Sequence, residues 1–181
     1  MSNFTRIVIL CEDRQQEVFA RHFLESCGVN RHHIYPNVCQ KGKQAGEQFV
    51  RQEYPKEVLG YRRVSGYLSA GLVVLTDADV KKVANRLVQF ETALKENKIS
   101  PRKPTERIGI FIPKRNIETW INFLMGRSVS EDETYPHLKR ESECIPYVNV
   151  FASRHAPLPV DAPPSLKTAC QELPRIFPED K

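Results

Sequence analysis

Acidic side chains follow two of the apolar runs in this sequence. Residues 71–76 form one run and lead directly into Asp77 and Asp79, which are one residue apart. Residues 6–11 form the other and end at Glu12. Carboxylates are the ligands that hard cations such as Mg²⁺ prefer, but aspartate is also favoured in turns and as a helix cap. The pattern alone therefore fits either a metal site or ordinary turns.

A third apolar run carries further charged groups. Residues 107–113 lead into Lys114 and Arg115, and Glu118 lies at the start of the helix that follows. In a parallel sheet the strand C-termini share one edge, where ligands bind. Carboxylates gathered at that edge repel one another unless a cation lies among them. Carboxylate-held Mg²⁺ beside basic side chains is suited to chemistry at a phosphodiester or a phosphate.

Each of these groups also fits a structural role. Glu118 can interact with the helix dipole, and Lys114 and Arg115 can be ordinary surface charges. The glycine- and lysine-bearing stretch KGKQAGE, residues 41–47, offers backbone amides at a helix start. It lacks the G-x-x-x-x-G-K-[ST] pattern of a nucleotide P-loop, so contact of Lys41 or Lys43 with phosphate is a secondary expectation. The joint occurrence of polar groups at three strand ends favours a functional site.

The elements that would position these groups alternate along residues 5–125. The strand-like runs are residues 6–11, 32–38, 71–76 and 107–113, and amphipathic helical patterns lie between them. In the helix after Asp79, apolar residues recur at three- and four-residue spacing; they are Val80, Val83, Leu87, Phe90 and Leu94. This alternation predicts a three-layer, Rossmann-like α/β fold with a mostly parallel four-stranded sheet.

The character of the chain changes after Gly126. Eight of the thirteen prolines fall between Pro136 and Pro178, and the segment before them is charged. We therefore expect residues 1–126 to form the α/β domain. Residues 127–181 are expected to form an irregular, proline-rich C-terminal extension with one short helix, capped by Ser165 and ending near Pro174.

Composition and charge indicate which partners and which cellular compartment are expected for this protein. The chain has 181 residues, a net charge of +5 and a pI near 9, which suits a polyanionic partner such as nucleic acid. No apolar run approaches the length of a membrane span, and the N-terminus has no export-signal pattern. Five scattered cysteines without C-x-x-C spacing indicate reduced thiols. A cytoplasmic protein that does not contact a membrane is expected.

Residues 5–125 resemble the TOPRIM domain. Its signature is a glutamate that ends the first strand, as in VILCED, and a D-x-D that ends a later one, as in VVLTDAD. Topoisomerases, primases, recombination proteins and the OLD-family nucleases share that domain. The segment IPKRNIETW is similar to the proline, basic residue and Glu-x-Trp segment of small stand-alone TOPRIM-like proteins. The chain departs from the family at Asp13, where glycine is frequent.

The resemblance implies a TOPRIM fold and a nuclease that depends on Mg²⁺, with Mn²⁺ as a substitute, and cleaves DNA or RNA. It implies that Glu12, Asp77 and Asp79 hold the metal ion, and that Glu12 also serves acid–base chemistry. Glu118 is the matching acidic residue of the third segment, and Lys114 with Arg115 would neutralise the phosphate. Some such proteins accompany ATPases in bacterial anti-phage systems, which implies a separate ATPase subunit because this chain has no P-loop.

Two other interpretations use the same residues. Receiver domains of two-component signalling place paired acids after the first strand, a phosphorylated aspartate after the third and a lysine at a later strand end. Glu12, Asp77 and Lys114 could form that set, although 65 residues between Glu12 and Asp77 is long for a receiver. The other interpretation is a catalytically degenerate TOPRIM module that only binds nucleic acid or a protein partner.

Overall fold

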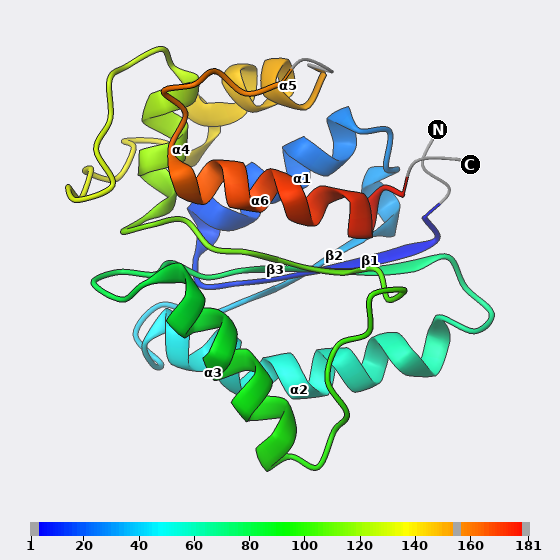
Figure 1. Cartoon of the computed structure of the whole chain (residues 1–181). Helices are drawn as coiled ribbons and strands as arrows, with labels where there is room; N and C mark the ends of the chain where they lie inside the picture. The colour runs from blue at the N-terminus through cyan, green and yellow to red at the C-terminus, as the bar shows by residue number, and fades with distance from the viewer. Residues whose placement is uncertain (1–3, 154–156, 179–181) are drawn as a thin grey trace.

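Four parallel strands form the sheet at the centre of this computed structural model, which describes residues 4–153 and 157–178 (Figure 1). The strands lie in the order β2-β1-β3-β4. Their bounds are β1 Arg6–Cys11, β2 Ile34–Val38, β3 Ala70–Leu75 and β4 Ile108–Phe111. The four predicted strands are therefore confirmed, and the sheet is parallel throughout.

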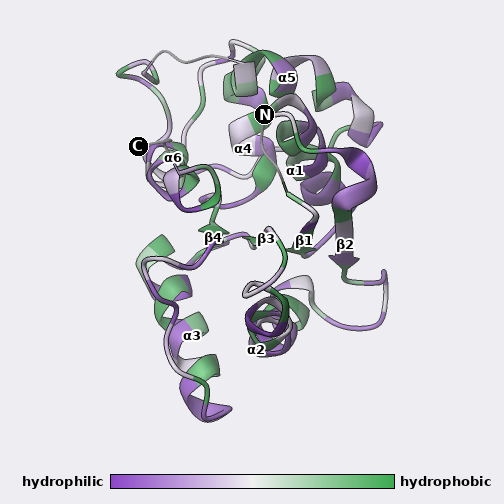
Figure 2. Ribbon diagram, turned by 90° about the vertical axis from the view of Figure 1, so that its right-hand side faces the viewer, coloured by the Kyte–Doolittle hydropathy of each residue, from purple (hydrophilic) through white to green (hydrophobic). Residues whose placement is uncertain are grey.

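Helices cover both faces of the sheet (Figures 1 and 2). One layer consists of α2 (Gly46–Val64) and α3 (Val83–Glu96). The opposite layer consists of α1 (Arg14–Ser26), α4 (Ile117–Leu124), α5 (Ile145–Ser153) and α6 (Pro164–Ile176). Short 3₁₀ helices span Arg31–His33 and Glu141–Cys144. This arrangement confirms the three-layer, Rossmann-like α/β fold.

The strands owe their apolar composition to burial on both faces. All six residues of β3 are buried, and in β1 only Arg6 is exposed. Side chains of β1 and β3 point alternately into the two layers, so Val73 belongs to one hydrophobic core and Val74 to the other. Such two-sided burial is typical of parallel strands.

The register of the sheet brings the strand ends into line. Leu10 in β1 pairs with Val74 in β3, and Leu75 in β3 pairs with Phe111 in β4. The residues that follow β1 and β3 are therefore neighbours at the carboxyl edge. This edge is where open α/β sheets bind ligands.

The C-terminal part of the chain differs from the predicted irregular extension. It contains α5 and α6, and Leu166 and Ile176 of α6 are buried in the same core as β1 and β3. Helix α6 begins at Pro164, where proline is favoured because the first helical N–H needs no partner inside the helix. Pro174 lies in the last turn, so the helix continues only to Ile176. The short helix predicted to end near Pro174 is therefore confirmed as α6, but Ser165 does not cap it, because Ser165 is its second residue and Pro163 precedes it.

Both edge strands have features that oppose further strand pairing. Pro36 lies in β2, and proline has no N–H to donate. At the other edge, Glu172 of α6 accepts a hydrogen bond from the Ile110 N–H of β4 at 3.1 Å. The Arg102 guanidinium donates to the Ile108 carbonyl at 2.7 Å and pairs with Glu172. The Ile110 N–H and the Ile108 carbonyl of β4 are thus bound by side chains.

The helix after the D-x-D segment starts later than predicted. Helix α3 begins at Val83, and Val80 lies in the preceding turn with a relative exposure of 79%. The turn contains Asp79 in the left-handed region, with φ 53°, and Asp79 forms an isolated bridge with Arg115. This conformation interrupts the helical pattern, so Val80 does not join the core. None of the helices in the described residues is long and apolar enough to span a membrane.

Candidate active site

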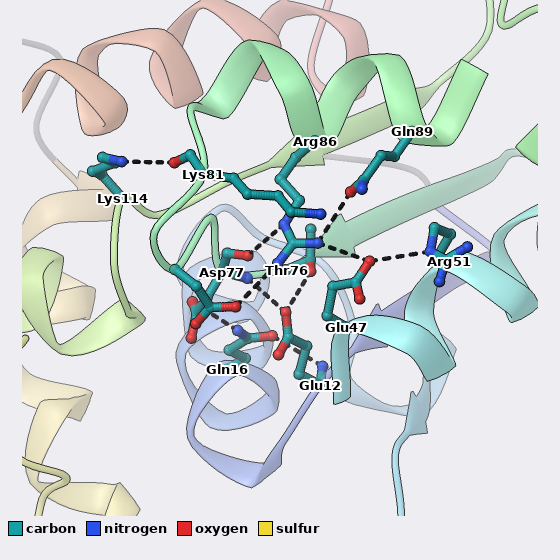
Figure 3. A network of polar contacts seen from close by, with 11 residues as sticks. Glu12, Gln16, Glu47, Arg51, Thr76, Asp77, Lys81, Arg86, Gln89 and Lys114 are labelled. Atoms are coloured by element: carbon teal, nitrogen blue, oxygen red, sulfur yellow. Dashed lines mark hydrogen bonds and ion pairs between the residues drawn. The ribbon is translucent and has the colours of Figure 1, made fainter. Parts of the chain in front are cut away.

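The side chain of Glu12 joins the ends of β1 and β3 (Figure 3). Its Oε1 accepts a hydrogen bond from the backbone N–H of Asp77 at 2.7 Å, and another from the Thr76 hydroxyl. Glu12 is the first residue after β1, and Thr76 is the first after β3. The strand register therefore brings together Glu12 and Asp77, as the sequence predicts.

Gln16 of α1 connects the two acidic residues. Its Nε2 donates to Asp77 Oδ1 at 2.9 Å, and its Oε1 accepts from the Glu12 N–H at 3.0 Å (Figure 3). Gln16 is fully buried, so this bridge is fixed by packing. Asp13 caps α1 by accepting from the Gln16 N–H at 2.9 Å. Asp13 thus has a local structural role as the cap of α1.

Burial raises the pKa of both carboxyl groups at this edge. Burial raises the pKa of Glu12 to about 7, against the lowering effect of its hydrogen bonds from Thr76 and Asp77. Burial likewise raises the pKa of Asp77 well above its ordinary value, and the charge of Glu12 raises it further. Such shifts indicate carboxylates that lack a compensating positive charge.

Asp79 points to a different neighbour. Its Oδ2 accepts from the Arg86 guanidinium at 3.0 Å, and its side chain is 58% exposed. Arg86 in α3 is buried and also donates to the Asp77 carbonyl at 3.1 Å and to Gln89 at 3.0 Å. It forms an ion pair with Glu47 at 2.8 Å (Figure 3). The two aspartates of the D-x-D segment are therefore in different environments.

The fit to a metal ion rests on Glu12 and Asp77. In the described part of the chain, no three His, Cys, Asp or Glu side chains group closely enough to hold a metal ion. Mg²⁺, however, is often bound through one or two carboxylates and keeps several waters. Glu12 Oε2 and Asp77 Oδ2 have no hydrogen-bond partner among residues 4–153 and 157–178. Two raised pKa values and two free oxygens fit a cation of this kind.

The predicted phosphate-binding residues lie around this edge. Lys114 Nζ donates to the Lys81 carbonyl at 2.6 Å, so it binds the D-x-D turn rather than a carboxylate (Figure 3). Arg115 has a left-handed φ of 66°, and its buried Nε has no partner within the described residues. Lys41 and Lys43 are exposed in the loop before α2.

The loop before α2 reaches the site through Gly46. A Cβ atom at Gly46 would lie 2.7 Å from Cβ of Glu12 and 3.0 Å from its Oε2. Only glycine allows the first turn of α2 to pack this closely against Glu12. The sequence stretch with Lys41 and Lys43 is therefore anchored next to the acidic pair.

Glu118 belongs to the same edge through α4. It is 1% exposed, and its Oε1 lies 2.6 Å from Nδ1 of His137. Its Oε2 is buried without a hydrogen-bond partner in the described residues. Burial raises the pKa of Glu118, and the charge of Glu118 helps to raise that of Asp77. Glu118 is thus paired with a histidine that the sequence analysis did not identify.

Sequence reasoning missed four residues of this network. Thr76 could have been found by its position directly before Asp77, and Gln16 by its position three residues after the cap at Asp13. Arg86 shares a face of α3 with Val83 and Phe90, and a charged residue on an apolar face signals a buried partner. His137 lies 19 residues from Glu118, and no pattern in the sequence links them.

Comparisons with protein-family models, curated proteins and solved structures found no match for this chain. Membership of the TOPRIM-like family therefore stays a prediction. It depends on the acidic residues at the strand ends and on the segment that contains Glu118.

Proposed function

We propose that the protein is a cytoplasmic, Mg²⁺-dependent nuclease of the TOPRIM type that cleaves DNA or RNA phosphodiesters. The observation that carries this proposal is the contact between Glu12 and Asp77 at the carboxyl edge of the sheet. Two adjacent carboxyl groups with raised pKa values, one buried at Asp77 and one half-buried at Glu12, are costly to hold together. A function that binds a cation explains why they are adjacent.

The proposal assigns a role to each residue of the edge. Glu12 and Asp77 would hold Mg²⁺, and Asp79 would join them only if its side chain left Arg86. A bound Mg²⁺ stabilises the charge that develops on the phosphate oxygens. Glu12 is also proposed as the acid–base residue, as the resemblance to TOPRIM proteins implies. The phosphate-binding residues in this proposal are Lys114, Arg115, Lys41 and Lys43.

The net charge of +5 supports a nucleic acid as the substrate. A separate ATPase is proposed as the controlling partner, because an unregulated nuclease endangers its own genome and this chain carries no P-loop. Anti-phage defence is the biological setting in which such a pair would act.

The second candidate is a catalytically degenerate module that binds nucleic acid or a protein without cleaving it. The ion pair between Asp79 and Arg86 favours this candidate, because it occupies one of the three predicted metal ligands. The receiver interpretation has less support. Lys114 donates to the Lys81 backbone carbonyl rather than to an acidic side chain.

The test is incubation with plasmid DNA, linear DNA and RNA, each with Mg²⁺, Mn²⁺ or EDTA. We expect cleavage that EDTA abolishes and that Asp77→Asn removes, with Glu96→Gln at the exposed end of α3 as the matched control. Retained binding of a labelled oligonucleotide without cleavage by the wild type would support the degenerate module instead. A mass increase after treatment with acetyl phosphate, absent in Asp77→Asn, would support the receiver.

A further inference from the structure

A buried carboxylate and an exposed imidazole form a pair beside the acidic site. The Glu118 side chain is 1% exposed, whereas that of His137 is 80% exposed, and their Oε1 and Nδ1 atoms are 2.6 Å apart. A carboxylate in this relation to Nδ1 fixes the orientation and the tautomer of the ring. The Nε2 atom of His137 has no hydrogen-bond partner in the described residues, so it is available to a ligand.

The segment that carries His137 is held against the start of α4. Asn116, which precedes α4, donates from Nδ2 to the Tyr135 carbonyl at 2.7 Å. The Tyr135 hydroxyl in turn accepts from the Ser130 N–H at 2.8 Å. Asn116 and Glu118 therefore fix the chain on both sides of Pro136. His137 is placed by packed elements, although it lies outside every helix and strand.

The pair lies within electrostatic reach of the proposed nuclease site. The charge of Asp13, next to Glu12, raises the pKa of both Glu118 and His137. The charge of Lys41, in the loop before α2, acts on His137 with the opposite sign. In Figure 1 the segment after α4 extends to the same side of the molecule as the connection between β3 and α3. Nucleic acid bound at the carboxyl edge would thus lie on the same side of the molecule as the segment that carries His137.

We propose that His137 is the general acid of the proposed nuclease and that Glu118 positions it. This inference rests on the proposed function. A water oxygen forms the new bond to phosphorus and releases one proton to Glu12, the acid–base residue of the proposed function, which passes it to solvent. The bond from phosphorus to the leaving oxygen breaks, and its electron pair stays on that oxygen. His137 donates the Nε2 proton to the leaving oxygen and afterwards regains a proton from solvent.

The protonation state of His137 suits this role. Its hydrogen bond to Glu118 raises its pKa above the ordinary value, with a further rise from the Glu118 charge. The facing charged groups are Glu118 from α4, Asp13 before α1 and Lys41 before α2; burial and the charge of Lys41 lower the His137 pKa, but the effect of Glu118 is larger. At neutral pH a larger fraction of the ring therefore carries the proton that a general acid must donate.

The experiment compares two substrates that differ at the leaving atom. His137→Gln should lose about 100-fold or more in kcat/KM on ordinary DNA. On DNA with bridging sulfur as the leaving atom, tested in 3′ and 5′ versions, the loss should be less than about fivefold, because a thiolate leaves without protonation. The control is His22→Gln, which removes a histidine paired with Glu25 on α1 at 3.2 Å and should keep full activity.

Further readouts separate this inference from the proposed function. The alkaline fall of the wild-type pH–rate profile should disappear in His137→Gln, and Glu118→Gln should lower the His137 pKa measured by NMR titration. Equal losses on oxygen and sulfur substrates, or full activity of His137→Gln, would overturn the role of His137 alone. A wild-type chain that cleaves no nucleic acid with Mg²⁺ or Mn²⁺ would overturn the proposed function and this inference with it.

Discussion

The Glu12 carboxylate accepts a hydrogen bond from the Asp77 backbone N–H at 2.7 Å, so one acidic side chain is bound to the backbone of another acidic residue. The two carboxyl groups are held near each other by β1 and β3 and by the Gln16 side chain. Neither has a positively charged side chain as a hydrogen-bond partner in the described residues. The proximity of these two carboxyl groups is therefore expected to cost stability when no cation is bound.

Removing either charge should reduce activity without loss of stability. Asp77→Asn and Glu12→Gln keep the side-chain shape and an acceptor oxygen for the Gln16 and Thr76 donors. Cleavage should fall by about 100-fold or more, because a ligand for the cation is lost. The free energy of unfolding in EDTA should hold or rise, because a buried charge is removed. Urea unfolding checks this, and a large loss of stability would mean that the two residues are structural caps.

Stability in EDTA should fall as pH rises from about 4.5 to about 7. Between these values the folded state binds more protons than the unfolded state, since burial raises the Glu12 pKa from 4.5 to about 7. Glu12 alone would contribute a loss of about 3 kcal/mol. Urea unfolding at pH 4.5 and pH 8 measures the change, and it should be smaller in Glu12→Gln. An equal change in wild type and variant would show that Glu12 titrates normally.

Arg86 should be the most important single cation for stability. It is 5% exposed and contacts Asp77, Asp79 and Glu47, so Arg86→Met leaves Glu47 with a poorly compensated charge. We expect a loss of about 3 kcal/mol or more in urea unfolding. The matched control is Arg51→Met, which removes a 42% exposed partner of the same Glu47 and should cost about 1 kcal/mol or less. Similar losses in the two variants would contradict the burial argument.

Helix α6 should be coupled to the segment that leads into α4. Ser165 Oγ accepts from Trp120 Nε1 at 2.8 Å and from the Lys114 N–H at 3.2 Å. Ser165→Ala leaves buried donors without a partner, which should cost about 1–3 kcal/mol. The fluorescence of Trp120, the single tryptophan, reports both its environment and urea unfolding. Thr168→Ala on the exposed face of α6 should change stability by less than about 0.5 kcal/mol.

The sheet and its acidic edge could be predicted because the relevant signals are local. Buried parallel strands are apolar over their whole length, and the residue after each strand must lie at the carboxyl edge. This reasoning places Glu12 beside Asp77 without knowledge of any side-chain contact. The direction of the Asp79 side chain could not be predicted, because it depends on a left-handed backbone and on Arg86 one turn into α3.

The C-terminal region was less predictable because its structure depends on tertiary packing. Proline interrupts a helix only where its missing N–H would have donated a helical hydrogen bond. Pro164 is the first residue of α6, where that N–H is not needed, so it does not break the helix. The pairing of Glu118 with His137 depends on the path of a connecting segment and on the bond from Asn116 to Tyr135. Contacts between a helix and a connecting segment leave no periodic pattern in the sequence from which they could be predicted.

The side chains on the outer edge of β4 bear on how copies of this protein behave at high concentration. Open edges of sheets pair readily with other chains and seed aggregates. Glu172 accepts from the Ile110 N–H and Arg102 donates to the Ile108 carbonyl, and Pro36 provides no N–H to a strand pairing with β2. The ion pair between Glu172 of α6 and Arg102 in the loop before β4 is therefore expected to oppose strand pairing between copies at this edge. Loss of Glu172 would leave the Ile110 N–H of β4 free to pair with a strand of another copy and so favour aggregation.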